Sequence, residues 1–178
     1  MTDSLFFDSD CISAFLWVGK EQILEQLYAG RIIIPKQVYE ELSYPRISHL
    51  KARTDEMITK EKAYIETISI DTIEYRQYYK LTAEPEKGTA VIGKGEAAAL
   101  VLAQNRNGIL ASNNLKDIGS YVNQYRIKHK TTGDILAEAL KYGIITEEQG
   151  NLIWERMLSR RRKIGASSFS AYLQEKYA

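Results

Sequence analysis

The chain has 178 residues, of which 44% are hydrophobic and 26% are charged. This length corresponds to one domain, and the composition supplies enough apolar surface for a packed core, which excludes a largely disordered chain. No stretch approaches 18 uncharged apolar residues, so a membrane-spanning helix is excluded, and a single cysteine excludes a disulfide framework. The opening MTDSLFFDSD has no basic segment before its apolar stretch, so we expect no signal peptide and a cytoplasmic location.

The formal net charge of +1 conceals an uneven distribution along the chain. Residues 1–43 hold three basic and seven acidic side chains, whereas residues 112–178 hold eleven basic and seven acidic ones. The segment between them is nearly balanced. Two explanations stay open, which are ordinary surface charge and a division between an acidic site and a basic binding surface.

Short apolar runs alternate with segments of helical periodicity. The runs predict strands at 4–7, 31–34, 64–70 and 108–111. The expected helices cover about 12–29 with a break near Gly19, 35–42, 46–62, 72–81, 96–104, a segment that begins at Ser112 and Asn113, 131–142, 146–163 and 168–176, and residues 82–95 form a loop. This alternation is typical of an α/β fold with a short, mostly parallel sheet and further helices at its C-terminal end.

Acidic and amide side chains recur where these elements begin or end. Asp8 closes the first strand, Glu41 lies in the helix after the second strand, and Glu96 opens a helix that is apolar on all sides. Ser112, Asn113 and Asn114 follow the strand at 108–111, and Asp117 comes one helical turn later. Because ligands of parallel sheets bind beyond the carboxyl ends of the strands, we expect these side chains to share a site.

Clustered carboxylates favour a divalent cation with oxygen ligands, such as Mg²⁺ or Mn²⁺, which can activate a water and stabilise a departing phosphodiester oxygen. The metal ligands expected here are Asp8, Glu96, Asn114 and Asp117. Each acid also has a structural explanation, since Asp8 can cap a helix, Glu96 can interact with a helix dipole, and Asp117 can be a surface charge. The two histidines lie in polar contexts, and Cys11 is expected in the core, so a nucleophile scheme is poorly supplied.

A basic cluster follows near the C-terminus. Arg160, Arg161, Arg162 and Lys163 form a run without an acid, one turn after Arg156. Such a cluster can neutralise the phosphates of a nucleic acid, and we expect it to bind RNA. Cations at a helix C-terminus are also favoured by the helix dipole, so both explanations stay open.

The pattern resembles the PIN-domain family of metal-dependent nucleases in four blocks. FFDSD resembles its first strand with a leading aspartate, and IIIPKQVYEEL its second strand with a glutamate, Glu41. GKGEAAALVLAQNRNGILASNNLKDI is similar to the segment that carries the third acid, Glu96, and TTGDILAEALKYGIIT is similar to the segment after the last active-site strand. The resemblance implies a three-layer α/β/α fold across a single domain, 1–178. The chain is longer than the compact members of the family, and the additions are a helical insertion around 44–80 and a basic helical tail at 146–178.

For function, the resemblance implies an RNA endonuclease whose catalytic residues are Asp8, Glu41, Glu96 and Asp117 and whose cofactor is Mg²⁺ or Mn²⁺. Ser112 and Asn113 would line the pocket and contact phosphate. Many small bacterial members are toxins held inactive by an antitoxin, so RNA, an antitoxin protein and a second copy of the chain are the expected partners. The fourth acidic position of the family reads Asn114 here, which brings no charge, and Asp117 is the expected substitute.

Two alternatives remain. The neutral Asn114 favours a PIN-fold nucleic-acid or protein-binding module with weakened catalysis. Asp8-Ser9-Asp10 after a strand also resembles the haloacid-dehalogenase-like phosphatases, with Gly133-Asp134 and Glu138 as a loose echo of their metal motif. That echo lacks the expected apolar strand, because Arg126-Ile127-Lys128-His129-Lys130 precedes it.

Overall fold

A computed structural model describes residues 3–178 of the chain, and the fold is built around a parallel sheet. In these residues the sheet has five strands, β1 (Leu5–Phe7), β2 (Ile32–Pro35), β3 (Ala63–Glu66), β4 (Ile109–Ala111) and β5 (Lys128–Lys130). Their order across the sheet is β3-β2-β1-β4-β5, and every neighbouring pair is parallel. Met1 and Thr2, which open the segment used to predict the absence of a signal peptide, lie outside the described residues.

The sheet separates two apolar cores because successive side chains of a strand point to opposite faces. In β1, Leu5 and Phe7 belong to the larger core, whereas Phe6 belongs to the smaller one. In β4, Ile109 and Ala111 alternate with Leu110 in the same way. The central strands β1 and β4 are therefore buried on both faces, which confirms the predicted three-layer α/β/α arrangement.

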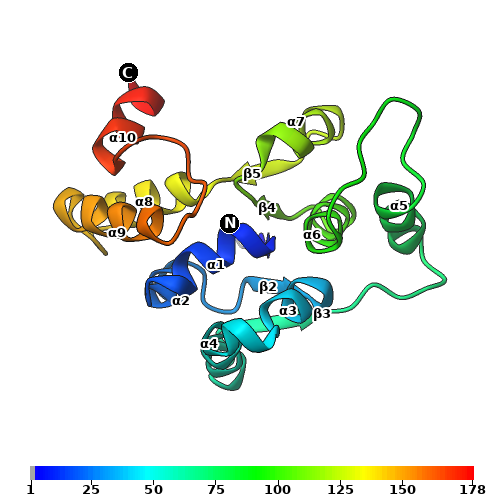
Figure 1. Ribbon diagram of the computed structural model, residues 1–178, viewed down its shortest axis with the longest axis horizontal. Helices are drawn as coiled ribbons and strands as arrows, with labels where there is room; N and C mark the ends of the chain where they lie inside the picture. Colours follow the sequence, from blue (N-terminus) through cyan, green and yellow to red (C-terminus); the bar gives the residue numbers. More distant parts are fainter. Residues whose placement is uncertain (1–2) are drawn as a thin grey trace.

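Helices cover both faces of the sheet (Figure 1). The larger core is formed with α1 (Ser9–Trp17), α2 (Glu21–Tyr28), α3 (Lys36–Leu42), α4 (Ser48–Thr59), α8 (Thr132–Lys141), α9 (Glu147–Ser159) and α10 (Phe169–Tyr177). The smaller core is formed with α5 (Ile73–Thr82), α6 (Lys94–Asn105) and α7 (Leu115–Gln124). A short 3-10 turn, Pro45–Ile47, precedes α4. In the described part of the chain, no helix combines the length and apolar character needed to cross a membrane.

The structure corrects several predicted boundaries. Sequence reasoning missed β5, because Lys128, His129 and Lys130 form an edge strand whose polar side chains give no apolar signal. The strand expected at 64–70 is β3 and ends at Glu66, and the helix expected to reach residue 163 is α9 and ends at Ser159. The expected 44–80 insertion is not only helical, since it contains β3, which pairs with β2 and forms one edge of the sheet.

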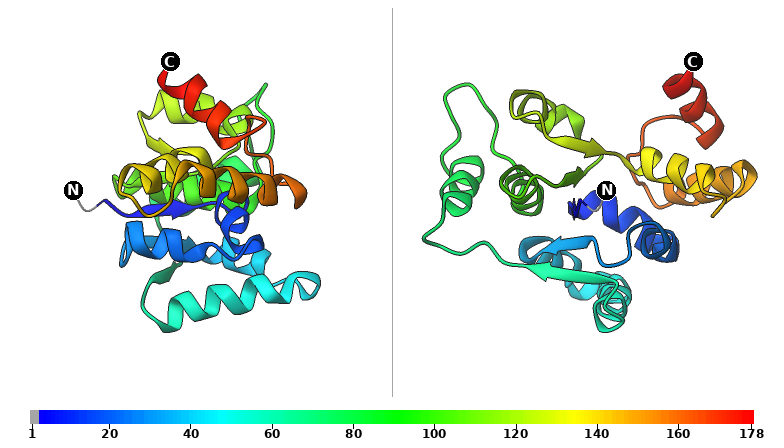
Figure 2. Two further views of the ribbon diagram at one scale, coloured as in Figure 1. Left: turned by 90° about the vertical axis from the view of Figure 1, so that its left-hand side faces the viewer. Right: turned by 180° about the vertical axis from the view of Figure 1, so that it is seen from behind.

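The C-terminal helix α10 is attached to α8 by polar contacts. Figure 2 shows α10 beside α8 and α9. A capping box at the start of α8 joins Thr131 and Asp134, as the sequence predicted. The Tyr172 hydroxyl of α10 donates to Asp134 Oδ1 at 2.7 Å, and Lys176 pairs with the same carboxylate. The Asp134 carboxylate therefore links α8 to α10.

Replacing Tyr172 by Phe should lower the free energy of unfolding by about 1–2 kcal/mol, because it removes a hydrogen bond to a charged, partly buried carboxylate. Tyr177→Phe is the matched control, since Tyr177 is in the same helix, is exposed and makes no side-chain hydrogen bond in residues 3–178. Urea unfolding measures the free energy of unfolding of both variants, and an equal decrease in the two would contradict a stabilising link between α8 and α10 through Tyr172.

Candidate active site

The candidate site lies where the strand order reverses. After β1 the chain adds β2 and β3 on one side, and later adds β4 and β5 on the other side of β1. The carboxyl ends of β1 and β4 therefore border the crevice where open parallel sheets bind ligands. Asp8 directly follows β1, and Ser112, Asn113 and Asn114 directly follow β4. The polar strand ends singled out from the sequence are neighbours in the structure.

Asp8 carries the most strongly buried carboxylate of this edge. Its side chain is 3% exposed, and its Oδ1 accepts a hydrogen bond from the backbone N–H of Cys11 at 2.8 Å, which caps α1. Burial raises the pKa of Asp8 to about 7 and outweighs the hydrogen bonds from Ser112 and Cys11, which lower it; the charges of Asp10 and Glu41 add smaller raising effects. Asp8 is thus both a helix cap and a buried acid with no cation beside it in residues 3–178.

Glu96 lies on the first turn of α6 and faces the same place. Burial, and next the charge of Asp8, raise the pKa of Glu96 to about 7, and a hydrogen bond from Asn114 only partly offsets this. Its Oε1 atom is buried and has no hydrogen-bond partner within the described residues. An orphaned carboxylate oxygen of this kind is costly in an apolar surrounding unless a ligand satisfies it.

Glu41 is held between two helices. Its Oε1 accepts from the backbone N–H of Gly95 at 2.9 Å, at the start of α6, and its Oε2 accepts from the Ser9 hydroxyl at the start of α1. Gly95 lets these side chains approach closely, because a Cβ would lie 2.9 Å from both Glu41 carboxylate oxygens and from Ser9 Oγ and would force them to move. The structure therefore brings Glu41 beside the start of the Glu96 helix, and it adds Ser9, which the sequence argument did not select.

The residues after β4 fall into two groups. Asn114 donates from its Nδ2 to Asp117 Oδ2 at 2.8 Å, so these two side chains lie together at the start of α7, next to Glu96. Asn113 instead pairs with Thr132, donating to its hydroxyl and accepting from its backbone N–H, both at 2.8 Å. Ser112 is fully buried and its Oγ accepts from the backbone N–H of Asn114. The phosphate contacts expected for Ser112 and Asn113 stay predictions, and the amide of Asn113 is already engaged.

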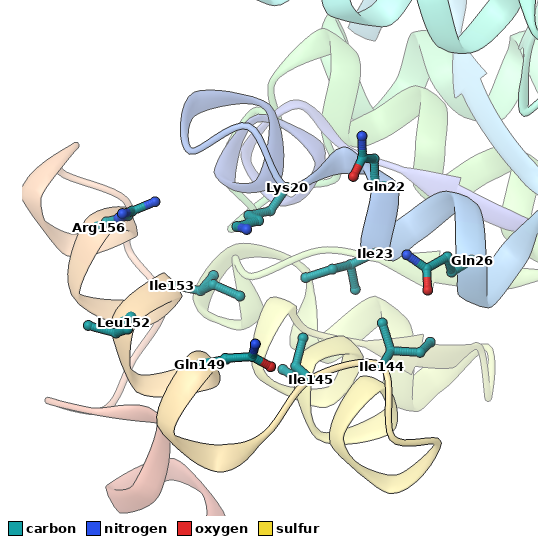
Figure 3. A pocket seen from close by; sticks show the side chains of 10 residues that line it. All are labelled: Lys20, Gln22, Ile23, Gln26, Ile144, Ile145, Gln149, Leu152, Ile153 and Arg156. Carbon is teal, nitrogen blue, oxygen red and sulfur yellow. The ribbon is translucent and has the colours of Figure 1, made fainter.

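The predicted RNA-binding cations do not act as one group. Arg160 and Arg162 place their guanidinium carbons 5.8 and 5.7 Å from the ring centre of Trp17 on α1. Arg161 and Lys163 are exposed and make no side-chain hydrogen bond or ion pair in residues 3–178. A separate pocket of about 250 Å³ opens between α2 and α9, with isoleucines on its floor and Lys20 and Arg156 near one end (Figure 3).

Comparison with known proteins agrees with this geometry. A family described as DUF3368, PIN domain, matches residues 4–176. The chain belongs to the PIN-domain family. The match includes both the 44–80 segment and most of the C-terminal helices. Neither the curated proteins nor the solved structures gave a match.

The structure and the family match both argue against the haloacid-dehalogenase-like phosphatase alternative. Asp134, which echoed a phosphatase metal motif, is occupied by Thr131, Tyr172 and Lys176. Glu138 forms an ion pair with Lys130 and accepts from the Tyr28 hydroxyl at 2.6 Å. Both acids therefore belong to the α8 surface, and the family match assigns the fold to a different class.

PIN domains are generally nucleases and typically use divalent metal ions. Within residues 3–178, no three acidic, histidine or cysteine side chains converge as a ready-made metal site. The donor chemistry nevertheless fits a hard divalent cation, because the site offers carboxylate and amide oxygens. The unpartnered Glu96 Oε1 and the buried Asp8 are the observations that favour such an ion.

The raised pKa of Asp8 predicts a pH-dependent stability. The pKa is 3.8 in the unfolded chain and about 7 in the fold, so the folded state binds the proton more tightly. The free energy of unfolding should therefore fall by on the order of 2–4 kcal/mol as the pH rises from about 4 to about 7. Asp8→Asn retains a cap for α1 and should flatten this dependence, leaving the smaller share due to Glu96. Urea unfolding across this pH range measures the difference, and identical slopes would refute it.

Gly95→Ala tests the Glu41 contact. The added Cβ should displace Glu41 at a cost of about 2–3 kcal/mol, which exceeds the roughly 1 kcal/mol that alanine gains as a helix former, so the free energy of unfolding should fall by a net of roughly 1–2 kcal/mol. Gly119→Ala in α7 is the control, because nothing lies within 4 Å of its Cβ, and it should be stabilised by about 0.5–1 kcal/mol. Parallel stabilisation of both variants would rule out a tight contact at Gly95.

Proposed function

We propose that this PIN domain is a metal-dependent endonuclease that cleaves RNA. The observation that supports the proposal is the gathering of the buried Asp8 carboxylate and the partly buried Glu96 carboxylate at the reversal point of the sheet. Two like charges in an apolar surrounding repel each other, and a divalent cation relieves that repulsion. A purely structural role would instead leave Asp8 as a cap and would give no reason for an unpartnered Glu96 oxygen beside it.

Asp8, Glu96, Asn114 and Asp117 would hold the cation, and Mg²⁺ and Mn²⁺ both suit these oxygen donors. When bound, such an ion polarises a phosphate and lowers the pKa of a water molecule. The protein itself fixes the donors. The Cys11 N–H orients the Asp8 carboxylate, and Asn114 orients Asp117.

Glu41 acts at the border of this site. Its carboxylate is already engaged by Gly95 and Ser9, so it fixes the start of α6, and with it Glu96, relative to α1. The arrangement keeps the acids in place before a substrate arrives. Preorganised groups of this kind lower the cost of stabilising charge in a transition state.

Asp8→Asn and Glu96→Gln should each reduce cleavage of a fluorescently labelled single-stranded RNA by about 100-fold or more, because each removes a carboxylate from the site. Both should also remove the rise in melting temperature that Mn²⁺ causes in the unmodified chain, a readout that does not depend on activity. Glu40→Gln is the matched control, since Glu40 is an exposed neighbour of Glu41 without a side-chain hydrogen bond in residues 3–178. Undiminished cleavage in both site variants would overturn the mechanism.

A binding module with weakened catalysis is the second candidate. The neutral Asn114 at the fourth acidic position and the absence of three converging acids within residues 3–178 favour it. Asn114→Asp separates the two candidates, because a restored charge should increase Mn²⁺ affinity and cleavage in a weakened enzyme. An unmodified chain that binds RNA but neither binds Mn²⁺ at millimolar concentration nor cleaves would support the binding module.

A toxin role with an antitoxin partner is a further part of the proposal and rests on family resemblance. The informative observation is genomic, namely a small overlapping reading frame immediately upstream that would encode the inhibitor. Growth arrest on expression of the unmodified chain but not of Asp8→Asn would connect such a role to the acidic site.

A further inference from the structure

The acidic site cannot by itself attract a phosphate backbone, because its carboxylates repel phosphate. Affinity for a polyanion has to come from cations elsewhere on the molecule. Many lysines and arginines of the chain are neutralised in ion pairs, such as Lys130 with Glu138 and Lys176 with Asp134. A useful binding surface must therefore be built from cations without such partners.

One such surface is centred on Trp17, the last residue of α1. Two guanidinium groups, those of Arg160 and Arg162, lie over the Trp17 ring, and the His49 ring contacts it in a T-shaped arrangement at 4.8 Å. Arg162 also donates from Nη1 to Ser13 Oγ at 3.4 Å, one turn nearer the start of α1. We call Trp17, Lys20, Arg156, Arg160 and Arg162 the arginine surface.

The turn after α9 decides which cations join this surface. Arg160 caps the C-terminus of α9, Arg161 has a φ of +58°, and the Arg162 Nε donates back to the Arg160 carbonyl at 3.0 Å. The left-handed backbone at Arg161 reverses the chain direction. Arg160 and Arg162 therefore contact Trp17 on α1, whereas the side chain of Arg161 is exposed to solvent. The selection is a property of the fold and cannot be read from the uniform run of basic residues.

The surface continues beyond α1. Figure 3 shows Lys20 and Arg156 on the same side of the pocket between α2 and α9, one residue after Gly19 and one turn before Arg160 respectively. Within residues 3–178, none of the four cations of the arginine surface forms an ion pair. Their positive charge is therefore available to an external anion.

The arginine surface and the acidic site lie on one helix. Asp8 caps the start of α1 and Trp17 ends it, which at 1.5 Å per residue separates them by about 13 Å along the axis. Asp10, Ser13 and Trp17 follow the spacing of one helix face, and Asp10 is close enough to raise the pKa of Asp8. A few nucleotides of a single strand can span that distance.

We propose that the arginine surface binds the phosphate backbone of a single-stranded RNA next to the phosphate held at the acidic site, with Arg160 and Arg162 as positioning residues. The proposal rests on the proposed nuclease function for its choice of RNA. The cation–π contacts with Trp17 restrain both guanidinium groups, so less conformational freedom is lost when they form paired hydrogen bonds with phosphate oxygens. Arg161 and Lys163 carry the same charge but lack this support.

The test compares two double variants with equal charge changes. In the Asp8→Asn chain with EDTA, which prevents cleavage, R160Q/R162Q should weaken anisotropy-measured binding of a labelled single-stranded RNA by about tenfold or more. The slope of log affinity against log salt concentration should also become less steep by about 1.4, as expected for two lost phosphate contacts on a single strand. R161Q/K163Q should change affinity by no more than about threefold. Equal losses in the two variants, or none in either, would overturn the proposal.

R160K/R162K keeps both charges but loses the planar guanidinium groups, and should show an intermediate loss if stacking and paired hydrogen bonds contribute. Competition with an excess of poly-glutamate distinguishes an RNA partner from an acidic protein segment. If it displaces RNA at equal charge concentration, the surface serves an acidic protein segment and the proposal for RNA fails.

Cleavage assays separate this inference from the proposed function. RNA binding that depends on Arg160 and Arg162 in a chain that does not cleave would retain the surface and reject the nuclease. Metal-dependent cleavage with unchanged KM in R160Q/R162Q would retain the nuclease and reject the surface.

Discussion

Burial of the Asp8 carboxylate at the reversal point of the sheet constrains everything around it. The strand before it is apolar on both faces and the helix after it needs its cap, so the side chain cannot turn away to solvent. Glu96 is brought against it by the equally buried helix α6, and the repulsion between the two acids is left uncompensated in the protein itself. The domain is therefore less stable at the carboxyl ends of its central strands than it would be with a cation bound there.

Local patterns in the sequence were sufficient for much of this arrangement. Apolar β1 ending at Asp8, and buried α6 opening with Glu96, are signals carried by a few adjacent residues, and both were predicted. Contacts between distant segments carry no such signal. The fit of Glu41 against Gly95 joins residues 54 apart, and the contact of Arg162 with Ser13 joins residues 149 apart. Only packing reveals them, as it reveals that Asn113 belongs to the scaffold at Thr132.

The uneven charge of the chain also acquires a spatial meaning. Acids of the first segment contribute to the start of α1, whereas cations of the last segment fold back onto its end at Trp17. The acidic first segment and the basic last segment thus meet at opposite ends of α1. The net charge of the whole chain, which is near zero, describes neither of them. The part of the basic run that stays in solvent, at Arg161 and Lys163, is explained equally well by an ordinary polar surface.

The polar strand β5 has a consequence for self-association. A parallel sheet has two open edges, and each offers unpaired backbone groups to a strand of another molecule. At β5 the cations Lys128 and Lys130 are tied to Asp3 and Glu138, and at the opposite edge Glu66 of β3 is tied to Arg106. A second copy that extended the sheet at β5 would have to approach through these fixed charges, whereas β3 carries a charge only at its last residue. The β5 margin is therefore the better protected against growth into a continuous intermolecular sheet.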